Sequence, residues 1–120
     1  MEKDFEKLRQ KMVEEQLISR GIEDETVLEA FKKTAREKFM LEKNRDYAYL
    51  DGAQSIEAGQ TISQPYIVAL MLQALKLKKD DRVLEVGTGS GYAAALLAEI
   101  VKEVYTIERI EQLAVKARKV

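Results

Sequence analysis

A glycine-rich segment and a later glutamate are the residues whose types and spacing best fit ligand chemistry. Residues 87–91 read Gly-Thr-Gly-Ser-Gly and stand where a β-branched run gives way to a helical pattern. Glycines let the chain turn tightly and let a ligand approach the backbone, and the start of a helix offers unpaired N–H groups. Glu108 closes the next strand pattern about 20 residues further on, where a carboxylate can accept hydrogen bonds from both hydroxyls of a ribose. This combination indicates a nucleoside-binding site.

The loop differs from a dinucleotide site in its third glycine. Tyr92 stands where the GxGxxG pattern has that glycine, which favours a nucleoside ligand without a pyrophosphate. S-adenosylmethionine fits this description, because its sulfonium and ammonium groups are cationic and Glu85 supplies a negative charge just before the loop. The alternative interpretation is that the glycines only make a tight turn and that Glu108 is a surface acid.

The elements that must position these residues form an α/β pattern. Strands are expected over 82–86 and 103–108, with a helix over 93–101 between them and another over 110–117. This order predicts a right-handed βαβα unit of a parallel sheet. Ahead of it we expect helices over 4–20 and from Asp24, a short turn over 36–40 and an irregular or weakly extended stretch over 44–59. The chain would then divide into a helical or irregular part, 1–58, and an α/β part, 59–120.

A further helix is expected after Ser63, ending near residue 75. Ser63 offers a capping hydroxyl and Pro65 suits a first helical turn. This helix belongs to the uncharged run 58–75, which contains too many polar residues to span a bilayer.

Composition excludes several classes of chemistry. The 120 residues include no histidine and no cysteine, which excludes Ser-His and Cys-His nucleophiles, zinc fingers and disulfide staples. Acidic and basic residues nearly cancel, at 21 against 20, so no global field favours a nucleic acid or a membrane as partner. We therefore expect a cytoplasmic protein that uses no metal.

Several segments together resemble the protein-L-isoaspartate O-methyltransferase family. The most specific segment is 60–66, Gln-Thr-Ile-Ser-Gln-Pro-Tyr, because many methyltransferases share the glycine loop. The resemblance extends over nearly the whole chain, and its other segments are 12–17, 20–22, 83–92 and 104–109. It implies a Rossmann-like methyltransferase sheet, of which this chain holds the first βαβα unit behind an N-terminal helical subdomain.

The resemblance also implies an activity and a set of site residues. The reaction would move a methyl group from S-adenosylmethionine to the α-carboxylate of an L-isoaspartyl residue in damaged protein. Ser63 would be the active-site residue, and the cofactor would lie against Gln60, Thr61, Ser63, Glu85, Gly87, Thr88, Gly89, Gly91 and Glu108. The absence of histidine is no obstacle, because a carboxylate is already ionised at pH 7 and a sulfonium is already activated. Thr61 and Ser63 could donate hydrogen bonds to the acceptor carboxylate.

The chain departs from the family pattern in two segments and in length. Residues 53–57, Ala-Gln-Ser-Ile-Glu, replace a Pro-Leu-Pro-Ile-Gly run, so Glu57 brings a negative charge near the arriving carboxylate. Ala35 replaces a proline. A sheet of this family has about seven strands and this sequence predicts two, so we expect an N-terminal portion that is inactive alone and binds S-adenosylmethionine weakly or not at all.

Two alternatives to this function remain open. The first is a non-catalytic chain that forms a homo-oligomer through exposed strand edges. The second is an S-adenosylmethionine-dependent enzyme acting on a small molecule or an RNA.

Overall fold

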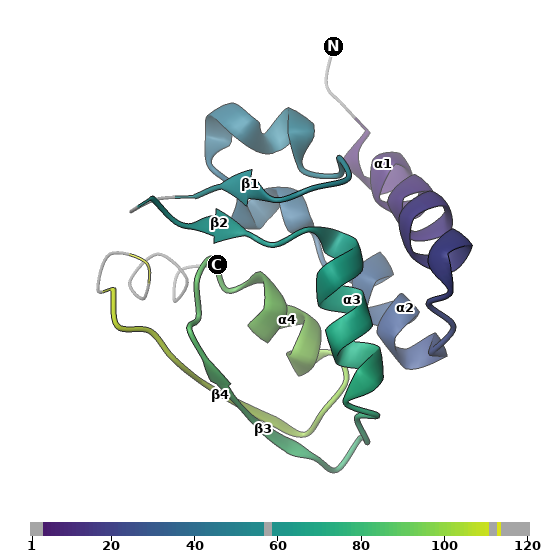
Figure 1. Ribbon diagram of the computed structural model, residues 1–120, viewed down its shortest axis with the longest axis vertical. Helices are drawn as coiled ribbons and strands as arrows, with labels where there is room; N and C mark the ends of the chain where they lie inside the picture. Colours follow the sequence, from purple (N-terminus) through teal and green to yellow (C-terminus); the bar gives the residue numbers. More distant parts are fainter. Residues whose placement is uncertain (1–3, 57–58, 111–112, 114–120) are drawn as a thin grey trace.

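Helices form the first part of the chain, and a two-stranded parallel sheet lies in the second part (Figure 1). The computed structural model describes residues 4–56, 59–110 and 113. In chain order its elements are α1 (Phe5–Met12), η1 (Val13–Leu17), η2 (Ile18–Arg20), α2 (Glu25–Lys33), η3 (Arg36–Phe39), η4 (Glu42–Tyr47), β1 (Gln54–Ser55), β2 (Thr61–Ile62), α3 (Pro65–Ala74), β3 (Arg82–Val86), α4 (Tyr92–Ala98) and β4 (Glu103–Ile107).

The first predicted helix, 4–20, is present but changes its winding along its length. Asp4 caps it by accepting a hydrogen bond from the Lys7 N–H at 3.1 Å. An α-helix, a π-helical turn and a 3-10 turn follow one another, and Gly21 ends the run with a φ of 95°. That left-handed conformation is the expected glycine stop.

The second predicted helix, α2, is confirmed with its cap and its buried face. The Asp24 carboxylate accepts hydrogen bonds from the N–H groups of Thr26 at 3.0 Å and Val27 at 3.4 Å. Asp24 is also tied to α3, because its own N–H donates to the Gln73 side-chain oxygen at 3.0 Å. As predicted, Val27, Leu28 and Phe31 are buried.

The stretch 44–59 is more regular than expected. It overlaps the 3-10 helix η4 and contains β1, which pairs antiparallel with β2 in the register Gln54↔Ile62 and Ser55↔Thr61. Strands of two residues are too short to show a period of two, which explains why the sequence pattern did not reveal them. The hairpin crosses the expected boundary between 58 and 59, and that division remains a prediction. Glu57 lies outside the described residues.

The expected capping role of Ser63 is wrong. Helix α3 begins at Pro65, the cap position is Gln64, and no side chain caps it. Pro65 has no backbone N–H, so the start of α3 has one N–H donor fewer for a capping side chain to bind. The fixed φ of proline also suits the first helical position. The Gln64 side chain instead donates to Asp51 at 2.7 Å. Ser63 therefore lies before the helix and is exposed.

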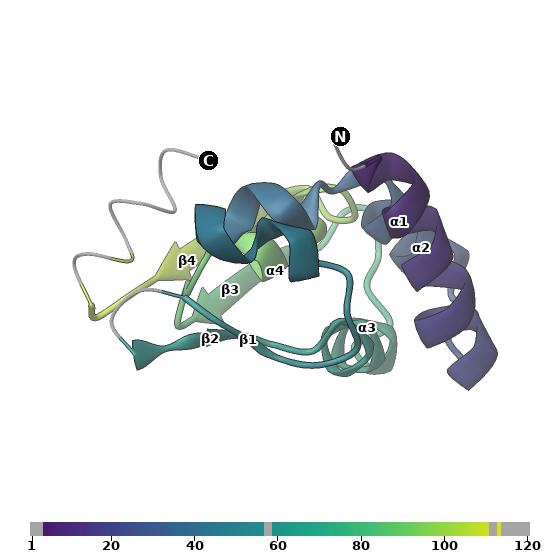
Figure 2. The ribbon, with the colours of Figure 1, turned by 90° about the horizontal axis from the view of Figure 1, so that it is seen from above.

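The parallel sheet is confirmed, with α4 crossing between its strands. β3 and β4 pair in register from Arg82↔Glu103 to Val86↔Ile107. In Figure 2 α4 lies between this sheet and the N-terminal helices. The fold is flat, with extents of 38 × 33 × 19 Å. Of the helix predicted over 110–117, the structure describes only Ile110 and Leu113. Within the described residues, no helix is both long and apolar enough to cross a membrane.

Candidate functional site

Two cavities meet at the glycine loop. The first, about 480 Å³, lies between α3 and β3, and the second, about 510 Å³, lies between the hairpin and the end of β4. Of the candidate residues, the first is lined by Thr61, Ser63, Glu85, Gly87, Thr88 and Gly89. The second is lined by Gln60, Thr61, Gly87, Gly89 and Glu108. Thr61, Gly87 and Gly89 border both cavities, so the structure brings the two sequence motifs to one place.

The glycine loop is held against the end of β4. Gly87 and Gly89 have φ values of 89° and 56°, which side chains rarely adopt. The N–H groups of Gly87 and Thr88 both donate to the Ile107 carbonyl, at 2.8 and 3.1 Å. Gly91 has a different place, because it is buried at the cap position of α4 with a φ of 92° and lines neither cavity. Its geometry serves the turn into α4.

Glu108 accepts a hydrogen bond from the glycine loop, which it was expected to face. Its carboxylate accepts from the Gly89 N–H at 2.8 Å and from the Ile110 N–H at 3.0 Å. These two backbone hydrogen bonds, Ile110 first, hold the pKa of Glu108 below its usual value. The carboxylate is thus kept ionised at the wall of the second cavity.

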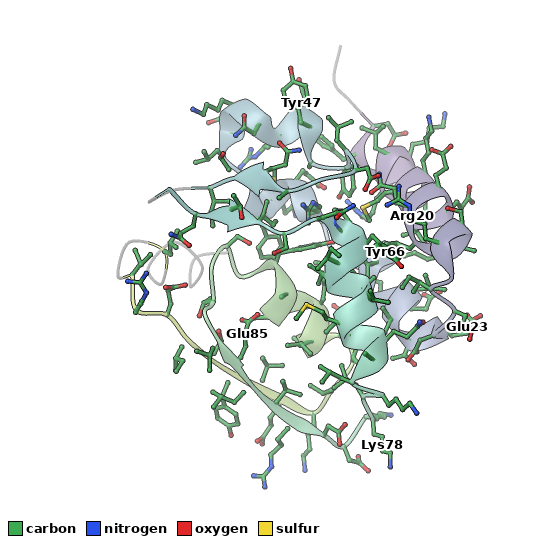
Figure 3. All side chains as sticks on the ribbon, viewed as in Figure 1. Arg20, Glu23, Tyr47, Tyr66, Lys78 and Glu85 are labelled. Carbon is green, nitrogen blue, oxygen red and sulfur yellow. The ribbon has the colours of Figure 1, made fainter. Side chains whose placement is uncertain are left out.

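Glu85 belongs to a polar chain that links the two strands to the loop. Thr106 Oγ1 donates to Glu85 Oε1 at 2.8 Å, and Thr88 Oγ1 lies 2.6 Å from Thr106 Oγ1. Glu85 points from β3 toward the interior that α3 and α4 border (Figure 3). Sequence reasoning missed Thr106, although the parallel register places it directly opposite Glu85.

The pKa of Glu85 should respond to Thr106. Burial raises the pKa of Glu85, the Thr106 hydrogen bond lowers it, and the charge of Glu108 raises it. Replacing Thr106 with valine removes the lowering contribution, so we expect the Glu85 carboxyl to titrate at a higher pH than in the unmodified chain. Carbon-13 NMR of the labelled carboxyl measures this, with Thr26→Val on α2 as control. An unchanged titration in Thr106→Val would contradict the hydrogen bond.

An ionic cluster formed by Arg20 and Asp51 holds the backbone next to Ser63. Arg20 forms an ion pair with Asp51, and the Arg20 guanidinium lies 5.5 Å from the centre of the Tyr66 ring. Arg20 and Tyr66 are seen beside the start of α3 in Figure 3. Asp51 also accepts the hydrogen bond from Gln64, so this cluster ties the residue after Ser63 to the N-terminal helical run.

Asp51 should titrate far below an ordinary aspartate. The hydrogen bonds from Arg20 and Gln64 lower the pKa of Asp51 to about 2. Because the folded-state pKa is depressed, the stability that this carboxylate contributes is present above its unfolded pKa and is lost as the pH falls toward about 2. Carboxyl NMR should show this low value, and Arg20→Gln should move it upward. A normal aspartate titration in the unmodified chain would contradict the cluster.

The structure also reveals a buried arginine behind the site. Arg36 Nη2 donates to the Ser63 carbonyl oxygen at 2.9 Å. Sequence reasoning did not single it out, because nothing local distinguishes Arg36 from the neighbouring surface cations. Among the described residues, no group of three or more acidic, cysteine or histidine side chains could hold a metal ion.

Comparisons of the sequence with known proteins find similarity to protein-L-isoaspartate O-methyltransferases. The family model described as protein-L-isoaspartate(D-aspartate) O-methyltransferase matches residues 7–120. The protein-L-isoaspartate O-methyltransferase of Pelotomaculum thermopropionicum is 58% identical over 110 residues, covering 92% of this chain and 48% of the relative. That of Petrotoga mobilis is 59% identical over 115 residues, covering 96% of this chain and 54% of the relative. The chain therefore spans about half the length of these curated relatives.

Solved structures agree with the sequence comparison. A protein-L-isoaspartate O-methyltransferase superposes with a TM-score of 0.81 at 29% identity, covering 92% of this chain and 37% of the other. A putative protein-L-isoaspartate O-methyltransferase from Plasmodium falciparum, in complex with S-adenosyl-L-homocysteine, gives 0.76 at 27% identity, covering 98% and 55%.

Proposed function

We propose that this chain, which belongs to the protein-L-isoaspartate(D-aspartate) O-methyltransferase family, takes part in methyl transfer from S-adenosylmethionine to the α-carboxylate of L-isoaspartyl residues. In this reaction the glycine loop, residues 87–91, is the cofactor loop, and residues 60–66 are the acceptor segment. The observation that carries this proposal is the position of Thr61, which borders both cavities at the point where the acceptor segment meets the glycine loop. A relative solved with S-adenosyl-L-homocysteine, the product left by the cofactor, supports it.

The residues of the two cavities fit a cationic nucleoside cofactor. Bound S-adenosylmethionine supplies an activated methyl group on a sulfonium. Glu85 offers a half-buried negative charge, and burial makes that charge costly unless a cation lies nearby. Glu108 orders the loop through Gly89 while keeping lone pairs for ribose hydroxyls. Contact of the cofactor with Gln60, Gly87 and Thr88, which line the cavities, is also part of the proposal. Gly91 lines neither cavity and would serve the cofactor site by making the turn into α4.

Ser63 and Thr61 would hold the acceptor. Both are exposed and both line the first cavity, so their hydroxyls can donate to one oxygen of an incoming carboxylate. The other oxygen attacks the methyl carbon: a C–O bond forms, the C–S bond breaks, and its electron pair remains on sulfur. No proton has to move at pH 7, so alignment is the main task of these residues.

Peptide methylation tests the activity. This chain would be joined at residue 120 to the part of the Petrotoga mobilis relative that follows the matched region, and methyl-ester formation would be measured on an isoaspartyl peptide and on its aspartyl isomer. We expect the joined protein to methylate only the isoaspartyl peptide, and the 120-residue chain alone to be nearly inactive. Equal methylation of both peptides, or methylation of RNA or of a small molecule instead, would contradict the proposal.

A second candidate, self-association, is favoured by an apolar face of the sheet. Leu84, Val86, Tyr105 and Ile107 are 62%, 77%, 57% and 55% exposed, and the register pairs Leu84 with Tyr105 and Val86 with Ile107. Each strand also has one edge that no other described strand covers. We propose that the isolated chain pairs with a second copy through this region. Light scattering should show a dimer that Val86→Lys dissociates, and a clean monomer would contradict it.

A cytoplasmic location is also part of the proposed methyltransferase function.

A further inference from the structure

Arg36 is a buried cation whose hydrogen bonds go to backbone carbonyl groups. Arg36 is 0% exposed to solvent. Nε donates to the Ala48 carbonyl at 2.7 Å and Nη2 to the Ser63 carbonyl at 2.9 Å, and the guanidinium carbon lies 4.9 Å from the centre of the Tyr92 ring. No ion pair joins Arg36 to a carboxylate within the described part of the chain.

This arrangement is costly if Arg36 serves stability alone. Burying a charge without a counter-ion costs free energy that two hydrogen bonds to uncharged carbonyl groups offset only in part. Nη1 of the guanidinium and the Tyr92 hydroxyl are also buried and make no hydrogen bond of regular geometry in the described structure. The two side chains nevertheless interact, because burial lowers the pKa of Arg36 and the interaction with Tyr92 raises it against that effect. An apolar side chain of similar size would avoid the buried charge but would leave the Ala48 and Ser63 carbonyl oxygens without this donor. What Arg36 provides is therefore the placement of these two backbone groups.

Arg36 touches both sides of the proposed site. Ser63, whose carbonyl it holds, lines the first cavity and is exposed there. Tyr92, which it faces, is the first residue of α4 and directly follows the glycine loop. The planar guanidinium has a fixed fork of donors, so it can hold two backbone groups at a set separation. Arg36 therefore links Ser63, through its carbonyl, to the residue that follows the glycine loop, through the Tyr92 ring.

We propose that Arg36 is a positioning residue that sets the place of Ser63 relative to the glycine loop during methyl transfer. The proposal rests on the proposed function, because it assigns a task in that reaction. Holding the Ser63 carbonyl inward leaves the Ser63 side chain on the cavity side. Burial lowers the pKa of Arg36, but the ordinary pKa of arginine lies so far above neutral that the guanidinium remains a cation and a donor at pH 7.

The hydrogen bond itself can be tested in the 120-residue chain without any activity. NMR should detect a through-hydrogen-bond coupling between the Arg36 side-chain nitrogen and the Ser63 carbonyl carbon. The carbonyl shift of Ser63 should move in Arg36→Lys and stay unchanged in Arg9→Lys. Arg9 is the matched control, because it bonds the Tyr49 hydroxyl at 2.9 Å and Glu37 but does not contact Ser63. A Ser63 carbonyl that responds equally to both variants would overturn the proposal.

Kinetics of the joined protein then separate positioning from folding. We expect Arg36→Met to lower kcat by about 100-fold, the size of effect that a misplacement of about 1 Å produces, with KM changed far less. Arg36→Lys should fall between Arg36→Met and the unmodified protein, and Arg9→Met should keep kcat while lowering the melting temperature. If Arg36→Met does not fold, Arg36→Lys decides, because it keeps the charge and loses the fork.

The outcomes distinguish this proposal from the function beneath it. An unmodified joined protein that methylates isoaspartyl peptide, with Arg36 variants of unchanged kcat, would overturn the positioning role and leave the function standing. A folded joined protein with no activity would overturn the proposed function and the role of Arg36 with it, whatever the NMR coupling shows.

Discussion

Replacing Glu108 with glutamine is expected to speed hydrogen exchange at the Gly89 amide by about tenfold, because a part-buried, charge-assisted hydrogen bond is lost. The Glu108 carboxylate accepts from Gly89 and Ile110 with its two oxygens. Glutamine has only one oxygen, so one of these N–H groups must face an amide NH2 group instead. The glycine loop should lose order at the point where the two cavities meet, and methyl transfer by the joined protein should fall accordingly.

Glu103→Gln is the matched control for this variant. Glu103 lies at the other end of β4, accepts a hydrogen bond from the Tyr105 hydroxyl at 2.8 Å, and lines neither cavity. Glu103→Gln makes the same change of charge at the opposite end of β4 from Glu108 and removes no hydrogen bond to Gly89, so Gly89 exchange should stay at the unmodified rate. Equal acceleration in both variants, or none in Glu108→Gln, would show that Glu108 does not order the loop.

Phe31→Ala is expected to produce the largest loss of stability, about 3–5 kcal/mol of unfolding free energy. Phe31 is 0% exposed and packs edge-on against Tyr92 with the ring centres 6.1 Å apart. Removing the ring leaves a cavity between α2 and the start of α4, where Tyr92 follows the glycine loop. The helical layer and the proposed site therefore lose their shared packing together.

Urea unfolding followed by circular dichroism measures this effect. Tyr47→Ala is the control, because Tyr47 is 53% exposed and its loss should change the unfolding free energy by less than about 0.5 kcal/mol. A loss below about 1 kcal/mol in Phe31→Ala would mean that the core between α2 and α4 is not packed as described.

Local patterns predicted the elements that position the glycine loop. The Asp24 cap, the Gly21 stop and the β3–α4–β4 order follow from residues that lie close together in sequence. The contact between Glu108 and the loop could also be expected, because parallel strands bring their carboxyl ends to one edge. These features depend on backbone preferences and strand order, which a single sequence carries.

Long-range contacts could not be predicted in the same way. Arg36 meets the Ser63 carbonyl across 27 residues, and no local signal marks an arginine that will be buried. Thr106 looked like an ordinary strand residue until the register placed it opposite Glu85. The capping prediction for Ser63 failed because Gln64 takes the cap position and sends its side chain to Asp51.

The most direct test of the central claim is an NMR titration of this chain with S-adenosyl-L-homocysteine. We expect weak binding, with a dissociation constant near or above about 1 mM, because the chain spans only about half the length of its relatives. The amide shifts should move at Gln60–Ser63, at Gly87–Gly89 and at Glu108 together, with one common dissociation constant. Shifts confined to the glycine loop, or different constants for the loop and for Gln60–Ser63, would contradict the claim that the two motifs form one site.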